Sequence, residues 1–210
     1  MTEQNQDLHG NAPDTSAVAL LLIDVINDLE FEGGEKLLPQ ALAMAQKLAE
    51  LKRRARAIPV IYVNDNFGKW RSDFQHLLKH CLEDGVRGEA VVRLLQPEAE
   101  DYFVLKPKHY GFFSTTLDIL LRYLQAQTLI IIGLATDICV FFTANDAYMR
   151  DFKIVVPSDC VAAEDNGRTE HALQLMQRVL KADIRPAEEL DLTSLVETTQ
   201  VKSHPQPSTS

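Results

Sequence analysis

Short apolar runs along the chain alternate with longer segments in which apolar residues recur every three or four positions. The run AVALLLID, residues 17–24, is apolar throughout and ends in an acid, which is the pattern of a strand buried on both faces of a sheet. Further runs of this kind predict strands at residues 58–65, 101–106, 128–134 and 153–158, and a short final strand at residues 182–186.

The segments between these runs have the spacing of amphipathic helices. Ser114 is a candidate N-cap for the predicted helix at residues 115–127. Because strands and helices alternate throughout, the chain is predicted to have an α/β fold, a three-layer α-β-α arrangement with a mostly parallel sheet. The predicted helices are residues 37–57, 70–84, 115–127, 137–150 and 167–181.

The length of 210 residues, 46% of them hydrophobic, suits one compact domain with a substantial core. We expect this single domain to span residues 16–192. A disordered N-terminal tail, 1–15, and a flexible C-terminal tail, 193–210, are expected on either side because both ends are polar.

Charge and cysteine usage narrow the partners and the location. The net charge of −9 disfavours nucleic acid and anionic membrane surfaces as partners, and it says nothing about a small-molecule substrate. No apolar run is long enough to span a bilayer, and the polar start has no leader pattern. The three cysteines show no spacing pattern, which favours a reducing, cytoplasmic location over a disulfide framework.

Three residues of complementary chemistry fall at carboxyl ends of predicted strands, where parallel sheets bind ligands. Asp24 ends the first strand, Lys106 ends the third, and Cys139 follows the fourth at the start of a predicted helix. A helix start and a nearby ammonium both favour the thiolate, the nucleophilic form of cysteine. Asp24 is a candidate general acid–base, and backbone N–H groups at and just before Cys139 are candidate oxyanion donors. The competing interpretation is an ordinary acid, a lysine reaching solvent and an inert buried cysteine.

Three stretches around these residues resemble the isochorismatase-like cysteine hydrolases, a superfamily that includes nicotinamidases, N-carbamoylsarcosine amidohydrolases and ureidoacrylate amidohydrolases. LLLIDVINDL resembles the family's first strand, with the catalytic acid at Asp24. GEAVVRLLQPEAEDYFVLKPKHYGFFSTTLDILL resembles the stretch around the catalytic lysine and favours Lys106 over Lys108. LIIIGLATDICVFFTANDAYMRDFKIVVPSDCVA resembles the nucleophile block, with Cys139 in the nucleophile's place.

The resemblance implies a six-stranded, mostly parallel sheet and assembly into a homodimer or higher homo-oligomer. It implies catalytic roles for Asp24, Lys106 and Cys139, no cofactor, and attack of the cysteine on an amide-type carbonyl to form a thioester. It also implies a cis peptide between Leu134 and Ala135, which costs about 3–4 kcal/mol. That bond would aim the Ala135 N–H, together with the Cys139 N–H, at the oxyanion.

The chain departs from two branches of the superfamily. Nicotinamidases carry an Asp-x-His pair after the second strand that binds a metal, whereas here Asp65 is followed by Asn66 and Phe67. Without those imidazole ligands, no metal site is expected. Isochorismate-cleaving members lack the nucleophilic cysteine, because vinyl ether hydrolysis needs an acid and no covalent intermediate. Cys139 therefore argues against that activity.

Aromatic residues near the three strand ends are candidates for substrate contact, although each is equally consistent with a place in the core. Phe112 is the best of them, because it occupies the family's aromatic position after the lysine. The side chain of His109 could equally line the pocket or face solvent, and the role of Cys160 is open. The candidate substrate-binding residues are Phe31, Asp65, Phe67, Trp70, Tyr110 and Phe112.

The sequence thus predicts a cysteine-dependent hydrolase that cleaves a C–N bond of a small amide, carbamoyl or ureido compound. Two alternatives stay open, namely a non-catalytic oligomeric binding protein on the same scaffold and an isochorismatase-type vinyl ether hydrolase. The identity of the substrate, the oligomeric state and any contribution of a neighbouring subunit to the pocket do not follow from the sequence.

Overall fold

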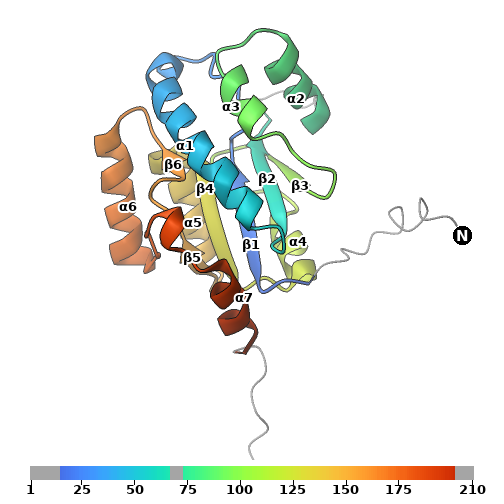
Figure 1. The fold of residues 1–210 in the computed structure, drawn as a ribbon, viewed down its shortest axis with the longest axis vertical. Helices are drawn as coiled ribbons and strands as arrows, with labels where there is room; N and C mark the ends of the chain where they lie inside the picture. The colour runs from blue at the N-terminus through green and yellow to red at the C-terminus, as the bar shows by residue number, and fades with distance from the viewer. Residues whose placement is uncertain (1–14, 67–72, 202–210) are drawn as a thin grey trace, which may run out of the picture.

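The computed structural model describes residues 15–66 and 73–201, and it contains one parallel sheet. The strand order is β3-β2-β1-β4-β5, and the two-residue strand β6 also pairs with β4 (Figure 1). The sheet is therefore six-stranded and parallel in every pairing, as expected. The strands are β1 Val18–Ile23, β2 Val60–Asp65, β3 Tyr102–Lys106, β4 Thr128–Leu134, β5 Lys153–Val155 and β6 Val161–Ala162.

Helices cover both faces of the sheet (Figure 1). The α-helices are α1 Gly34–Arg54, α2 Phe74–Glu83, α3 Glu89–Leu94, α4 Leu117–Leu124, α5 Phe141–Tyr148, α6 Asn166–Leu180 and α7 Leu192–Val201. A single turn of π-helix, η3 Thr136–Val140, precedes α5, and a 3-10 turn, η4 Ala187–Glu189, precedes α7. None of the described helices combines the length and the apolar composition that a membrane span requires.

The unbroken apolar runs have a simple physical cause, because alternate residues of a strand point to opposite faces of the sheet. On β1, Leu20 and Leu22 pack in the cluster formed with α1, α2 and α3. Leu21 and Ile23 pack in the second cluster, with α4, α5 and α6. Both faces of the central strands are therefore excluded from water, which favours apolar residues at every position.

Several boundaries differ from the expectation. The predicted strand at residues 182–186 contributes only an isolated bridge between Asp183 and Val155, and β6 is the sixth strand instead. Thr116, not Ser114, occupies the N-cap of α4. Helix α3 was not predicted.

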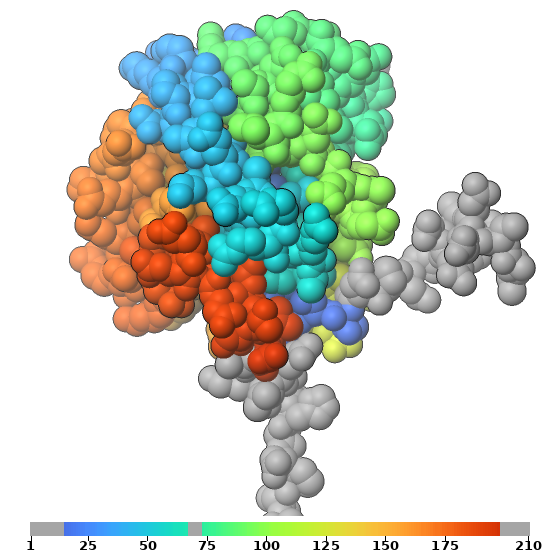
Figure 2. Space-filling model, viewed as in Figure 1, coloured from blue at the N-terminus to red at the C-terminus, as the bar shows by residue number. Residues whose placement is uncertain are grey.

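The predicted flexible tail from residue 193 is wrong as far as Val201, because α7 continues to that residue. Leu192, Leu195 and Val196 of this helix pack on the same apolar cluster as α1. Helix α7 accordingly lies on the face of the molecule that α1 also covers (Figure 2). The sparse apolar residues of α7 gave a weak periodicity, and its helical structure depends on packing against the domain.

Candidate active site

Three strands bring the predicted catalytic side chains to one edge of the sheet. Asp24 follows β1 directly, Lys106 is the last residue of β3, and Cys139 lies in the π-turn that follows β4. In the parallel register, Lys106 stands beside Asp65 of β2. The carboxyl ends of β3, β2, β1 and β4 therefore form the floor of one site, which is where α/β sheets bind ligands.

The three predicted catalytic groups are in contact. The Lys106 ammonium lies 2.8 Å from the Asp24 carboxylate and 3.6 Å from the Cys139 sulfur. A second carboxylate, that of Asp65, lies 3.6 Å from the same ammonium, and the Asp65 backbone N–H donates a 2.7 Å hydrogen bond to Asp24. Lys106 is fully buried and Asp24 is nearly so, so little water screens these charges.

The pKa values of Lys106 and Cys139 are both raised, which favours a charged ammonium and a neutral thiol. Burial disfavours the ammonium of Lys106, but the Asp24 carboxylate and the neighbouring sulfur outweigh it, so the pKa of Lys106 is raised above its usual value. Burial, followed by the charge of Asp24, raises the pKa of the Cys139 thiol, and Lys106 opposes this shift only in part. Cys139 therefore rests as a thiol, and a base must take its proton before it can attack a substrate.

The backbone around β4 explains how the sulfur reaches this position. Gly133 has a φ of +116°, and a Cβ added there would lie 2.2 Å from the backbone oxygen of Ile23. Only glycine permits this close approach of β4 to β1. The chain then turns through η3, where the Ala135 carbonyl accepts hydrogen bonds of 3.1 Å from Ile138 N–H and Val140 N–H. Single π-turns inside helices are rare and are frequent at functional sites.

The predicted cis peptide between Leu134 and Ala135 is wrong, because none of the described peptide bonds is cis. A trans bond is the ordinary form, favoured by about 3–4 kcal/mol for residues other than proline. With this trans bond, the Ala135 carbonyl accepts the hydrogen bonds at the start of the π-turn that are described above. Ala135 and Cys139 both line the pocket, so their service as oxyanion donors stays a prediction.

A pocket of about 260 Å³ opens above the sulfur. Of the predicted substrate contacts, Phe31 and Asp65 line it. The sequence left open whether His109 lines the pocket or faces solvent. In the structure His109 lines the pocket, and its Nδ1 atom lies 3.5 Å from the Cys139 sulfur. Cys139 is 9% exposed, whereas Cys81 and Cys160 are 0% exposed, so Cys139 is the most accessible of the three cysteines.

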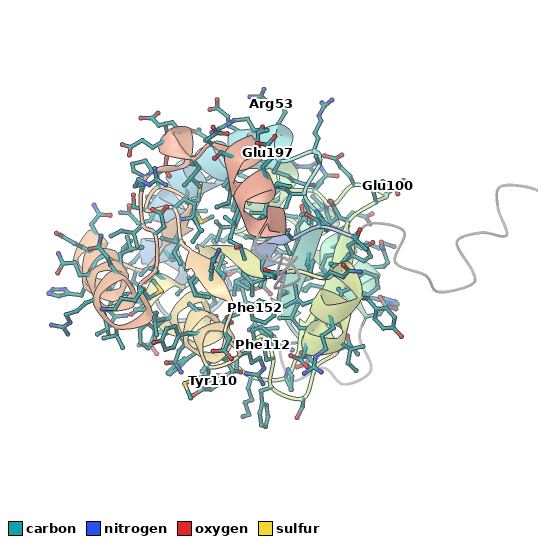
Figure 3. All side chains as sticks on the ribbon, turned by 90° about the horizontal axis from the view of Figure 1, so that it is seen from below. Arg53, Glu100, Tyr110, Phe112, Phe152 and Glu197 are labelled. Atoms are coloured by element: carbon teal, nitrogen blue, oxygen red, sulfur yellow. The ribbon has the colours of Figure 1, made fainter. Side chains whose placement is uncertain are left out.

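Two predicted substrate contacts lie elsewhere. Phe112 is buried in the core beside Phe152, at a ring distance of 6.1 Å, on the face that α4 and α5 cover (Figure 3). Tyr110 packs on Phe142, at 4.8 Å, and does not line the pocket. Both predictions are wrong, because side chains four and six residues beyond the end of a strand can turn either way. Phe67 and Trp70 lie outside the described residues.

The outer wall of the pocket was missed by the sequence analysis. Asp137, Glu164 and Arg168 line it, the last two from the segment that leads from β6 into α6. Strand β6 has only two residues, too few to show an apolar run, so nothing in the pattern placed its end beside the site. A polar turn after a short strand resembles any surface loop. The role of Cys160 was open. Its side chain is buried in the apolar cluster with α1, on the face of the sheet opposite the cluster that contains Cys139.

The metal ligands of nicotinamidases have no counterpart in the described part of the chain. No group of three or more His, Cys, Asp or Glu side chains is placed there to hold an ion. Asp65, which stands where the family's metal-binding aspartate would be, instead faces the ammonium of Lys106. The donor set at this position therefore fits an ion pair and lacks the imidazoles that a transition metal prefers.

Comparisons with known proteins agree with this geometry. The isochorismatase domain matches residues 18–185. The chain is 40% identical over 174 residues to the uncharacterized isochorismatase family protein YaaI of Bacillus subtilis, covering 82% of this chain and 95% of that protein. It is 31% identical over 172 residues to the ureidoacrylate amidohydrolase RutB of Yersinia enterocolitica, covering 69% and 75%.

Solved structures show the same fold. The N-carbamoylsarcosine amidase of Thermoplasma acidophilum matches with a TM-score of 0.64 and 28% identity, covering 83% of this chain and 98% of that one. The pyrazinamidase/nicotinamidase of Streptococcus mutans matches with a TM-score of 0.62 and 26% identity, covering 80% and 99%. The chain therefore belongs to the isochorismatase family of hydrolases.

Proposed function

We propose that this protein is a cysteine-dependent hydrolase that cleaves the C–N bond of a small amide, carbamoyl or ureido compound through a thioester. The observation that carries the proposal is the convergence of a carboxylate, an ammonium and a thiol at the floor of an open pocket. Lys106 contacts both Asp24 and Cys139, at 2.8 and 3.6 Å. This arrangement supplies a base, a charge partner and a nucleophile within reach of one carbonyl group.

The first half of the reaction forms the thioester. Asp24 accepts the thiol proton as the Cys139 sulfur attacks the carbonyl carbon, and the carbonyl oxygen becomes an oxyanion. Backbone N–H groups of the π-turn are the proposed donors to that oxygen. The C–N bond then breaks, and Asp24 returns the proton to the nitrogen, which leaves as ammonia or an amine.

The second half regenerates the enzyme. A water molecule attacks the thioester carbon and gives a proton to Asp24, and that proton returns to the departing sulfur. Lys106 keeps its charge throughout, because the pKa of its ammonium is raised by Asp24 and the sulfur even though it is buried. It holds Asp24 in place and offsets the negative charge that appears on Cys139.

The relatives support amide chemistry over the alternatives. Three of the matches above have names that state an activity. They are a ureidoacrylate amidohydrolase, an N-carbamoylsarcosine amidase and a pyrazinamidase/nicotinamidase. A binding protein without activity is less well supported, because the space above the sulfur, about 260 Å³, is open to a small molecule. A vinyl ether hydrolase would leave the accessible thiol without a role.

A screen for ammonia release from a panel of small amides, carbamoyl and ureido compounds tests the proposal. We expect the wild type to release ammonia from at least one compound, and the Cys139→Ala variant to release none. Cys160→Ala is the matched control, since it removes a buried thiol outside the pocket and should keep the activity. Activity that survives Cys139→Ala would reject the covalent mechanism.

A further inference from the structure

The wall of the pocket carries an excess of negative charge. Four carboxylates line it, and the described lining residues include one permanent cation, Arg168. Lys106 lies beneath them as a second cation. The carboxylates are those of Asp24, Asp65, Asp137 and Glu164. Taken together, these described residues carry four negative and two positive charges, an excess of two negative charges.

Among the described lining residues, Arg168 is the one permanent cation that would attract an anion into the pocket, and carboxylates of this chain already surround it. Its guanidinium lies 3.4 Å from Glu164, 3.7 Å from Asp165 and 3.8 Å from Asp137. With its side chain 49% exposed, Arg168 is solvated as well. A substrate carboxylate would therefore have to displace one of these partners and then sit beside the others.

Glu164 is held in its place by the fold. A Cβ added to Gly33 would lie 2.6 Å from a carboxylate oxygen of Glu164, so this carboxylate lies directly against the start of α1. The N-terminal end of a helix carries partial positive charge, which favours a carboxylate there. Helix α1 has 21 residues, and its N-cap residue Gly33 offers no side chain, so the nearby Glu164 carboxylate lies in the favourable field of that helix end.

The deeper cation offers no alternative. Lys106 is fully buried behind Asp24, and both Asp24 and Asp65 lie close to its ammonium, at 2.8 and 3.6 Å. The rest of the described wall is mostly apolar, with side chains from Phe31, Leu37, Leu134 and Ile138, and Asn27 and His109 add two polar groups without a negative charge. Apart from Arg168, whose guanidinium already faces carboxylates, the charged groups that a molecule meets on the described wall are therefore carboxylates.

We propose that the site selects uncharged substrates, namely neutral amides or ureas with a small apolar group, and discriminates against those that carry a carboxylate. This inference rests on the proposed function, because it assumes that the molecule bound in the pocket is a substrate. The preference for an uncharged molecule follows from the charges of the described pocket residues. Ureidoacrylate is itself a carboxylate, so the inference predicts that it is a poor substrate for this protein.

Two alkylating reagents that differ in charge test the inference without any turnover. Iodoacetamide is neutral and iodoacetate is an anion of nearly the same shape, and both alkylate thiols. The rate ratio of iodoacetamide to iodoacetate at Cys139, read from the mass of the peptide that carries it, is divided by the same ratio for N-acetylcysteinamide. We expect a quotient of at least about 10, which corresponds to 1.4 kcal/mol, and a decrease in high salt.

Charge-removing variants identify the source of the discrimination. Glu164→Gln and Asp137→Asn should each lower the quotient severalfold, and either one suffices if the other does not fold. Glu170→Gln, on the exposed face of α6 and outside the pocket lining, is the matched control and should leave the quotient unchanged. A quotient of about 1 or below in the wild type, or one that neither pocket variant changes, would overturn the inference.

Hydrolysis of matched pairs gives the second readout. Succinamide and succinamate, and likewise N-carbamoylglycinamide and N-carbamoylglycine, differ by one charge at nearly constant shape. We expect kcat/KM to favour the neutral member of a pair, and faster hydrolysis of the anion would overturn the inference. Discrimination between the alkylating reagents without hydrolysis of any amide would count against the proposed function and leave the charge preference of the pocket in place.

Discussion

Replacing Lys106 by methionine tests the buried ion pair on which the site depends. The side chains are similar in length, so the change removes the charge and leaves most of the packing. In the wild type the ammonium lies 2.8 Å from Asp24 and 3.6 Å from Asp65, and it is fully buried. The variant therefore leaves two carboxylates at the floor of the site without the cation that compensates them.

The magnitude follows from the burial. Removing one partner of a buried ion pair costs about 3–5 kcal/mol, because the remaining charge is neither solvated nor paired. For a chain of this size, 1 kcal/mol corresponds to a shift of about 2–4 °C in Tm, so we expect Tm to fall by about 10 °C. Adding Asp24→Asn to Lys106→Met removes one of the stranded charges, and the double variant should regain at least about 2 kcal/mol of the loss.

Urea denaturation followed by circular dichroism measures these free energies of unfolding. Lys108→Met is the matched control, since Lys108 is exposed in the loop after β3 and its loss should change stability by less than about 0.5 kcal/mol. The reasoning is refuted if Lys106→Met is as stable as Lys108→Met, or if the double variant is no more stable than Lys106→Met. Either result would mean that no buried ion pair stabilises the site.

Three further outcomes follow from single features of the structure. Gly133→Ala should lower the free energy of unfolding by roughly 3 kcal/mol or more, measured by urea titration, because its Cβ would meet the backbone of β1 at a positive φ. Since burial and then Asp24 raise the pKa of Cys139, iodoacetamide should label Cys139 more slowly at neutral pH than it labels N-acetylcysteinamide, and Asp24→Asn should speed labelling while it abolishes hydrolysis. Faster labelling of the wild type than of Asp24→Asn would contradict this assignment. The pKa of His80 is raised, chiefly by its hydrogen bond to Asp84, so the stability it contributes is complete below its unfolded pKa of about 6.5 and is lost as pH rises through the higher folded value. The stability difference between wild type and His80→Gln should therefore shrink from acid to alkaline pH, and a difference that grows would show the opposite shift.

The fold and the floor of the site could be predicted from the sequence because both follow from strand patterns. Continuous apolar runs locate central strands, and the residue that ends such a run must lie at the edge of the sheet. Asp24 was found in this way at the end of the central strand β1. Lys106 ends the edge strand β3, where the apolar run is shorter, and it lies 2.8 Å from Asp24. The signal is strong because burial on both faces constrains every position of the run.

The wall of the pocket could not be predicted, because its residues follow elements that leave little trace in the sequence. Arg168 and Glu164 reach the site only because β6, a strand of two residues, pairs with β4. Phe112 was placed in the pocket by its position relative to Lys106, yet it packs in the core beside Phe152. Side-chain direction in a loop depends on tertiary packing, which sequence spacing does not determine.

Rapid acid quenching during turnover, followed by mass spectrometry of the intact protein, tests the central claim most directly. With a substrate from the amide panel, we predict a transient mass increase equal to the acyl group, located on the peptide that contains Cys139. The Cys139→Ala variant should show neither the adduct nor hydrolysis. Steady turnover by wild type with no acyl adduct at any time, together with full activity in Cys139→Ala, would contradict the account.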